Sequence, residues 1–212
     1  MESFNKECDI WIPSCRPQLA EESKKLLSPY YAKIYNGTGY NSFSKLMNEC
    51  IAKSENEIVI ISNDKARAKS YHVNKIINLL NQGFGFVGLY RFGFFGFKKD
   101  LIRKIGFFDE RFIGGGYEDN DFVTRVKEAD IAHYLSEEIP YVQLRTLWHY
   151  EMALPHFLNK WDYRPPVTIR RKLPEEKYSY EIGEYKGTSF LKFSDSVFML
   201  YANKDWIPMK VL

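Results

Sequence analysis

The chain has 212 residues, of which 45% are hydrophobic and 17% aromatic, so it can bury a substantial core and is not intrinsically disordered. Its 30 basic and 27 acidic residues nearly balance, and no dense run of lysine or arginine occurs, which argues against nucleic acid as the main partner. No apolar stretch reaches the ~18 residues that a membrane-spanning helix needs. The length suits one large domain, or one domain with a long appendage.

The cysteines and the N-terminal segment bear on the compartment. The odd number of cysteines, Cys8, Cys15 and Cys50, and the absence of a C-x-x-C pair argue against a disulfide framework and favour a reducing environment. The first residues lack a charged segment followed by an apolar one, so we expect no signal peptide. These observations predict a soluble, cytoplasmic protein without a transmembrane segment.

Strands and helices alternate along the first two thirds of the chain. We expect strands at 8–13, 31–35 and 57–61 and, after a Gly/Phe-rich strand-like stretch at 83–97, at 131–135 and 139–144. Apolar spacing predicts helices at 21–27, 42–53, 69–80, 100–105 and 121–129. This alternation is typical of an α/β domain with a mostly parallel central sheet flanked by helices.

The composition changes after His149, where prolines interrupt a segment rich in charged residues. We therefore expect one catalytic or binding domain at residues 1–150. Residues 151–212 are expected to form a C-terminal appendage packed on that domain, with short antiparallel strands at 190–193 and 197–201.

The segment from Phe108 to Phe122 combines three glycines with a cluster of acids, Glu118, Asp119 and Asp121. Glycines let a backbone approach a ligand closely, and carboxylates packed this tightly repel one another unless cations or a polar ligand compensate them. The alternative is a glycine-rich turn followed by an acid-capped helix. On these residues alone the two interpretations carry equal weight.

A second candidate site follows the apolar segment Glu57–Ile61, which ends abruptly at Ser62-Asn63-Asp64. Open α/β sheets bind ligands at the carboxyl ends of their strands, and Asp64 there could hold Mg²⁺ or Mn²⁺ together with substrate phosphates. The alternative, that Asp64 caps the following turn, is somewhat favoured by this segment alone.

Other candidate ligand-binding residues are weak signals when taken one at a time. Ser14 and Arg16 follow the first expected strand, where a nucleotide base often binds, whereas Tyr40, Asn41 and Lys45 open the next helix, where a phosphate could bind. His149 is either a structural histidine or a metal ligand, and a histidine beside a carboxylate would favour Mn²⁺ over Mg²⁺. The chain has no G-x-G-x-x-G after a strand and no P-loop motif.

The order of these segments resembles the GT-A class of glycosyltransferases. Ser62-Asn63-Asp64 is followed by Ile105-Gly106-Phe107-Phe108-Asp109-Glu110-Arg111-Phe112, by Gly116-Tyr117-Glu118-Asp119-Asn120-Asp121-Phe122, by Arg125 and by Trp148-His149. The run is similar to that of inverting family-2-like enzymes and of galactosyltransferases with a glycine-rich Glu-Asp loop, including small virus-encoded or bacterial ones. The resemblance covers about residues 7–150, and the chain could be one domain of a longer polypeptide.

The resemblance implies a GT-A-like fold and an activity. The expected reaction is inverting transfer of a sugar from a nucleotide-diphosphate donor, most often UDP-linked, to a hydroxyl of a glycan or glycoprotein acceptor, with Mn²⁺ or Mg²⁺ as cofactor. Asp64 matches the last acid of the D-x-D motif, which holds the metal, and His149 matches a second metal ligand of some members. Asp119 matches the general base, with Glu118 orienting the acceptor. Asn63 would line the donor site.

Several points stay open. Ser62 stands where the family has the first acid of D-x-D, so a metal-independent variant is an alternative. Asp121 is expected to cap or anchor the following helix, and Lys160 and Trp161 are candidate phosphate and sugar contacts. Two other functions are compatible with the sequence, a nucleotidyltransferase-like enzyme and a catalytically impaired carbohydrate-binding or nucleotide-sugar-binding module.

Overall fold

The computed structural model describes residues 7–39, 42–112 and 116–142, together with Phe157, Lys160 and the backbone of four strands between residues 181 and 208. Contacts divide the chain into two compact units. The first comprises Met1–Tyr40, Lys45–Phe108 and Phe122–Thr146, and the second comprises Asn41–Ser44, Asp109–Asp121 and Leu147–Leu212. None of the helices in the described residues is long and apolar enough to cross a membrane.

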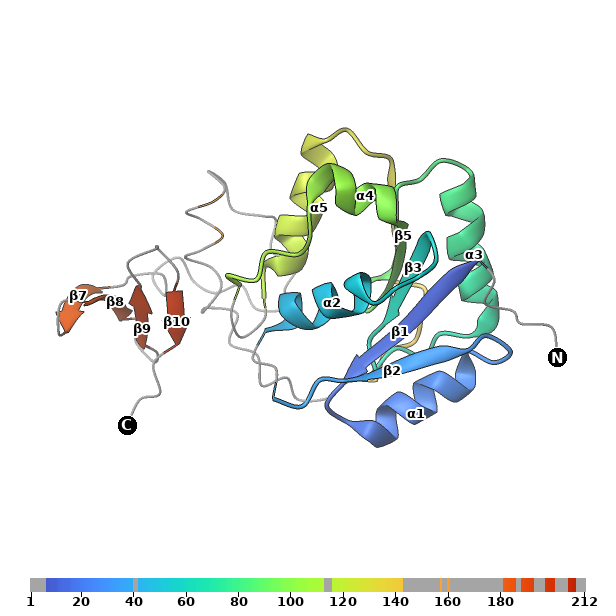
Figure 1. Ribbon diagram of the computed structural model, residues 1–212, viewed down its shortest axis with the longest axis horizontal. Coiled ribbons are helices and arrows are strands. Elements are labelled where there is room, and N and C mark those ends of the chain that lie inside the picture. Colours follow the sequence, from blue (N-terminus) through green and yellow to red (C-terminus); the bar gives the residue numbers. More distant parts are fainter. Residues whose placement is uncertain are drawn as a thin grey trace. The chain divides into compact units, whose positions relative to one another are not determined.

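A six-stranded sheet forms the centre of the first unit, with the strand order β2-β1-β3-β5-β4-β6 (Figure 1). Its strands are β1 (Cys8–Ser14), β2 (Ala32–Asn36), β3 (Ile58–Ser62), β4 (Phe86–Phe92), β5 (Phe94–Lys98) and β6 (His133–Leu135). All neighbours are parallel except β5, which runs antiparallel to β3 and β4. The carboxyl ends of β1, β2, β3 and β4 therefore lie at one edge of the sheet, which we call the carboxyl edge. This arrangement confirms the predicted α/β fold class.

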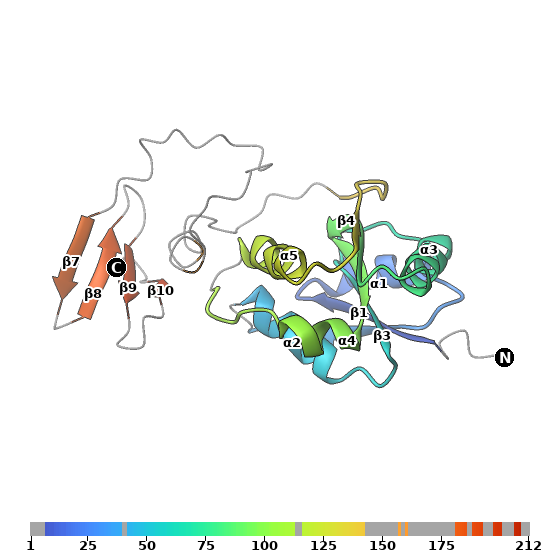
Figure 2. The ribbon, with the colours of Figure 1, turned by 90° about the horizontal axis from the view of Figure 1, so that it is seen from above.

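Helices cover both faces of this sheet. They are α1 (Pro17–Leu26), α2 (Phe43–Ala52), α3 (Ser70–Asn81), α4 (Lys99–Ile105) and α5 (Glu118–Glu128). Helices α1 and α3 lie on one face, and α2, α4 and the part of α5 from Phe122 onward lie on the other (Figure 2). Local chemistry sets their ends, since Pro17 occupies the first turn of α1 and Gly106, at φ 80°, ends α4.

Alternating side chains of the strands build a separate core layer on each face. Beneath α1 and α3 the layer is aliphatic and includes Ile10, Ile60 and Val73. Gly96 allows α3 to approach the sheet, because a Cβ there would stand 2.6 Å from Ile76. On the other face the layer is aromatic, and the stacked rings of Phe108 and Phe122 lie 4.3 Å apart.

The second unit contains a four-stranded antiparallel sheet in the order β10-β9-β8-β7. Its strands are β7 (Glu181–Tyr185), β8 (Thr188–Lys192), β9 (Val197–Leu200) and β10 (Trp206–Pro208). Two of them, β8 and β9, overlap the strands expected at 190–193 and 197–201. The proposed boundary between residues 150 and 151 remains a prediction.

Three elements differ from the sequence-based expectation. The stretch 83–97, expected only to be strand-like, contributes to two strands, because the chain reverses between them: the Gly93 amide donates to the Tyr90 carbonyl at 2.6 Å, and Arg91 has φ 46°. Helices α1 and α5 each begin several residues earlier than their apolar pattern, because they open with proline or polar residues, which leave no apolar signal. In the described part of 139–144, the only pairing is a bridge between Tyr141 and Ala66.

The aromatic layer gives a stability prediction with an internal control. Phe122 is fully buried, whereas the side chain of Phe107 is 48% exposed. We expect Phe122→Ala to lower the free energy of unfolding by about 3–5 kcal/mol, because it leaves a cavity, and Phe107→Ala to lower it by less than about 1 kcal/mol. Urea unfolding monitored by circular dichroism measures both values, and equal losses would show that Phe122 does not pack as described.

Candidate functional site

Three polar side chains meet at the carboxyl edge. Ser14 ends β1, Arg16 follows it, and Asp64 lies just beyond the end of β3. The Ser14 hydroxyl donates to Oδ2 of Asp64 at 2.5 Å, and the Arg16 guanidinium grips the carboxylate with two parallel bonds, Nε to Oδ2 at 2.9 Å and Nη2 to Oδ1 at 2.7 Å. Because β1 and β3 are parallel neighbours, residues about 50 positions apart converge at one point.

The pair is asymmetric in its exposure. The Asp64 side chain is 2% exposed, and that of Arg16 is 41% exposed. Both carboxylate oxygens of Asp64 are occupied by donors, in the bidentate geometry of strong guanidinium–carboxylate pairs. The buried Asp64 carboxylate therefore neutralises the charge of Arg16, while part of the guanidinium remains exposed to solvent.

The two residues before Asp64 shape the turn. Ser62 is completely buried, and its hydroxyl lies 3.4 Å from the hydroxyl of Ser23 on α1. An aspartate at position 62 would bring a second carboxylate into this covered space beside Asp64. Asn63 accepts the Lys65 amide at its Oδ1, 3.0 Å away, and donates its own amide to the Gly93 carbonyl at 2.7 Å.

Lys65 is a site residue that the sequence reasoning missed. It is only 7% exposed, and its ammonium lies 5.0 Å from the centroid of the Tyr141 ring. Burial, and then the charge of Arg16, lowers the pKa of Lys65. Its position directly after Asp64 was the one available signal, but a lysine in a polar turn is ordinarily solvated.

The structure brings together only some of the predicted donor-site residues. Ser14, Arg16, Asn63 and Asp64 lie at the carboxyl edge, whereas Lys45 is exposed in the first turn of α2 and makes no contact with Asp64. Tyr40, Asn41, Trp161 and His149 lie outside the described residues. Within the described segments no cluster of three histidine, cysteine or acidic side chains could hold a metal ion.

The second unit contains the acidic segment. Asp109 accepts a hydrogen bond from the Lys160 ammonium at 2.8 Å, and the fully buried Asp121 forms an ion pair with the same ammonium at 2.7 Å. Lys160 thus compensates carboxylates here. Asp121 lies inside the first turn of α5 rather than ahead of it, so it does not cap the helix but is anchored by Lys160.

Glu118 and Asp119 share the first turn of α5 but differ in environment. Glu118 is 8% exposed, and one of its oxygens accepts the Gly116 amide. Burial, together with the negative charge of Asp119, raises the pKa of Glu118 to about 8. Asp119 accepts the Asn120 amide at 2.8 Å.

The backbone before this pair is unusual. Gly116 has φ 117° and Tyr117 has φ 64°, so two successive residues occupy the left-handed side of the φ range. The Tyr117 ring packs against Phe157 at a centroid distance of 5.5 Å, which holds it in place. Backbone strain of this kind costs about 1–3 kcal/mol and tends to persist at functional sites.

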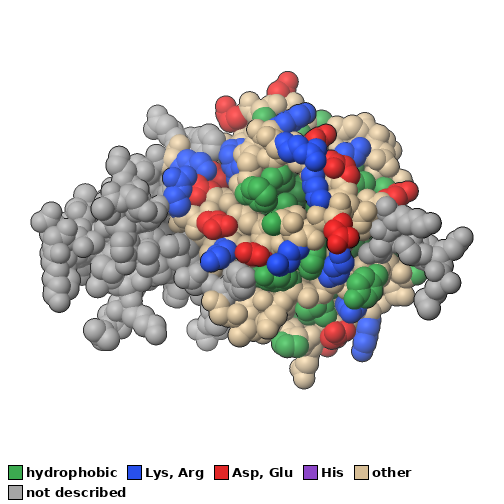
Figure 3. Space-filling view, viewed as in Figure 1, with side chains coloured by type: hydrophobic (Ala, Val, Ile, Leu, Met, Phe, Trp, Pro, Cys, Tyr) green, Lys and Arg blue, Asp and Glu red, His purple; other side chains and the backbone are tan. Residues whose placement is uncertain are grey.

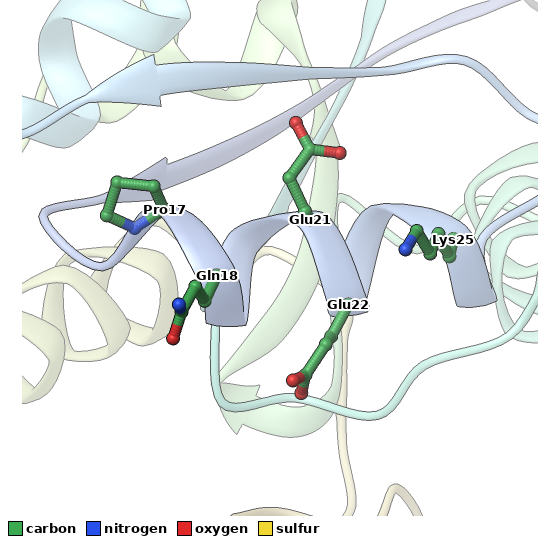
Figure 4. A pocket seen from close by; sticks show the side chains of 5 residues that line it. All are labelled: Pro17, Gln18, Glu21, Glu22 and Lys25. Carbon is green, nitrogen blue, oxygen red and sulfur yellow. The ribbon is translucent and has the colours of Figure 1, made fainter.

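Elsewhere the described surface offers no comparable cluster. A hollow of about 390 Å³ runs along α1, and its lining residues all belong to that one helix, Pro17, Gln18, Glu21, Glu22 and Lys25 (Figure 4). On the face shown in Figure 3, acidic and basic side chains are interspersed rather than gathered by sign. The hollow is therefore a solvated helix surface.

Comparison with known proteins identifies the fold. No protein-family description and no curated protein sequence matches the chain. Among solved structures, glucosyl-3-phosphoglycerate synthase from Mycobacterium tuberculosis, in complex with Mn²⁺, UDP and glucosyl-3-phosphoglycerate, aligns with a TM-score of 0.58 at 11% identity, covering 98% of this chain and 89% of the synthase.

Two further structures agree. A mannosyltransferase from Pyrobaculum calidifontis, in complex with GDP-mannose and Mn²⁺, aligns with a TM-score of 0.54 at 13% identity over 73% of this chain, which spans only 63% of that enzyme. The catalytic domain of Drosophila β1,4-galactosyltransferase 7, in complex with xylobiose, gives a TM-score of 0.51 at 10% identity, covering 88% of this chain and 93% of that one. The chain therefore has a GT-A-like fold, as the sequence predicted.

The raised pKa of Glu118 gives a stability prediction. Between pH 4.5 and about 8 the folded protein retains a proton that the unfolded chain releases, so the free energy of unfolding should fall as pH rises through this window. The slope from this group approaches about 1.4 kcal/mol per pH unit. Glu118→Gln should remove this contribution.

Urea unfolding at several pH values from 5 to 8 measures the effect. Glu128→Gln, at the exposed end of the same helix, is the matched control and should keep the wild-type slope. Parallel curves for the wild type and Glu118→Gln would show that Glu118 ionises normally.

Proposed function

We propose that the chain is a glycosyltransferase that transfers a sugar from a nucleotide-diphosphate donor, UDP-linked in the first instance, to a hydroxyl of a glycan acceptor. One observation carries the proposal: a GT-A-like sheet in which Ser14, Arg16 and Asp64 converge at the carboxyl edge, where open α/β sheets bind ligands. Solved structures of this fold contain GDP-mannose or UDP, which supports the donor class.

In this proposal Asp119 is the general base, as the sequence resemblance implies. In the proposed step its carboxylate accepts the proton of the acceptor hydroxyl, the hydroxyl oxygen forms a bond to the anomeric carbon, and the bond from that carbon to the diphosphate breaks. The diphosphate leaves with the bonding electrons, and attack from the opposite side inverts the anomeric configuration. Glu118, protonated at neutral pH, orients the acceptor beside the base.

The divalent cation needs separate consideration. Mn²⁺ is present in two of the similar structures, and the sequence assigns Asp64 and His149 as its ligands. His149 lies outside the described residues, and both oxygens of Asp64 already accept hydrogen bonds from Ser14 and Arg16. A cation at Asp64 would have to displace a like-charged guanidinium. The described residues thus do not fit an open metal site, and no step of the proposal passes through a metal.

A second candidate is a nucleotide-sugar-binding module without catalytic activity. The serine at position 62, where the resemblance expects an acid, favours this candidate. Both candidates bind the donor, but only the glycosyltransferase turns it over and releases a nucleoside diphosphate. A panel of UDP-glucose, UDP-galactose and GDP-mannose, incubated with saccharide acceptors and assayed for released nucleoside diphosphate, separates them.

Asp119→Asn gives the sharpest test of the base. We expect the rate of transfer to fall by about 10²–10⁴-fold, because the amide cannot accept the acceptor proton, while the dissociation constant of the donor changes less than about twofold. Nucleotide release and calorimetric titration of UDP measure the two effects. Glu128→Gln in the same helix should retain wild-type turnover. Wild-type turnover in Asp119→Asn itself would place the base elsewhere.

A further inference from the structure

Formally charged side chains buried in the described part of the first unit are Asp9, Asp64 and Lys65. Two of them have ionic partners. Asp9 accepts a hydrogen bond from the Lys33 ammonium at 2.8 Å and two more from backbone amides of residues 55 and 56. Asp64 is compensated by Arg16. Burying a charge is costly unless it is paired, and both carboxylates follow that rule.

Lys65 is the exception. Its ammonium contacts the face of the Tyr141 ring at 5.0 Å and has no carboxylate or carbonyl acceptor within the described residues. Its backbone is fixed on both sides, since its amide donates to Asn63 Oδ1 at 3.0 Å and its carbonyl accepts the Val142 amide at 2.9 Å. The lysine is therefore held at the carboxyl edge without a described carboxylate in ion-pair contact.

Arg16 and Lys65 together leave this edge with an excess of positive charge. Asp64 neutralises one of the two cations, and the Arg16 side chain is 41% exposed, so a ligand can reach guanidinium N–H groups that do not bond Asp64. A bound anion would supply the missing compensation.

We propose that Arg16 and Lys65 bind the diphosphate of the donor, and that a nucleoside diphosphate binds here without a divalent cation. This inference rests on the proposed function and names the groups that would neutralise the leaving diphosphate. The ammonium of Lys65 gains by exchanging the ring of Tyr141 for phosphate oxygens, because charge-assisted hydrogen bonds are stronger than a cation–π contact. Asp64 is then a positioning residue that fixes Arg16.

This role gives Asp64 an effect opposite in sign to that of a metal ligand. If Asp64 held a cation, Asp64→Asn would weaken nucleotide binding. If Asp64 only positions Arg16, asparagine keeps one oxygen that can accept a hydrogen bond from the guanidinium, and the change removes a negative charge beside the phosphate site. Nucleotide affinity then stays the same or rises.

The test is calorimetric titration of UDP, GDP and inorganic pyrophosphate, first in excess EDTA and then with Mn²⁺. We expect a nucleoside diphosphate to bind the wild type in EDTA and each of Lys65→Met and Arg16→Met to weaken binding at least tenfold. Asp64→Asn should bind as tightly as the wild type or more tightly. Lys25→Met, at an exposed position of α1, removes the same charge and should leave affinity unchanged.

Thermal unfolding of the Lys65→Met variant distinguishes a role of Lys65 in ligand binding from a role in stabilising the fold. Lys65→Met removes a buried, uncompensated cation, so its midpoint of thermal unfolding should equal or exceed that of the wild type while its nucleotide affinity falls. A midpoint well below that of the wild type, with unchanged nucleotide affinity, would contradict the inference.

The outcomes also distinguish this inference from the proposed function. Binding of UDP or GDP only in the presence of Mn²⁺, lost in Asp64→Asn and unchanged in Lys65→Met, would overturn the inference and leave the glycosyltransferase proposal standing. Absence of binding by any of the three probes, with or without Mn²⁺, would overturn both.

Discussion

The ion pair between Arg16 and Asp64 is the interaction on which the carboxyl edge depends. It joins the ends of β1 and β3 through two hydrogen bonds of 2.9 and 2.7 Å, and a third bond from Ser14 completes the set. Removing one partner of such a pair leaves a buried charge uncompensated, which is costly. The turn at residues 63–65 is held in place as well, because Asn63 and Lys65, on either side of the buried Asp64 carboxylate, form hydrogen bonds of their own.

Much of this fold could be predicted from the sequence, because hydrophobic periodicity reports directly on which face of an element is buried. The strand ending at Ser62 and the helix at residues 70–81 are of this kind. The reversal within residues 83–97 could not be predicted, since phenylalanines on both strands give one continuous apolar pattern. Its signal is conformational, the φ of 46° at Arg91, and no composition rule reveals it.

The candidate site also has one part that the sequence predicts and another that only the structure reveals. The position of Asp64 at the end of a buried strand was predictable, because strand ends can be located from the sequence. The partner of its carboxylate was not, since spacing along the chain carries no information about which side chains meet across neighbouring strands. The raised pKa of Glu118 also required the structure, because it arises first from burial, which adjacent acids in a sequence do not disclose.

Two features give the carboxyl edge the same kind of charge: residue 62 is a serine rather than an acid, and Arg16 pairs with Asp64. Both favour positive charge from side chains over a bound metal. A diphosphate leaving group needs nearby positive charge, which a metal or protein cations can provide. Ser62, which the sequence resemblance matches to the first acid of D-x-D, is buried against Ser23 and is not a ligand that favours a metal. Pairing the remaining acid with Arg16 occupies both of its oxygens. Lys65 then adds a cation that forms no ion pair with a described acid, so the side chains at this edge carry an excess of positive charge.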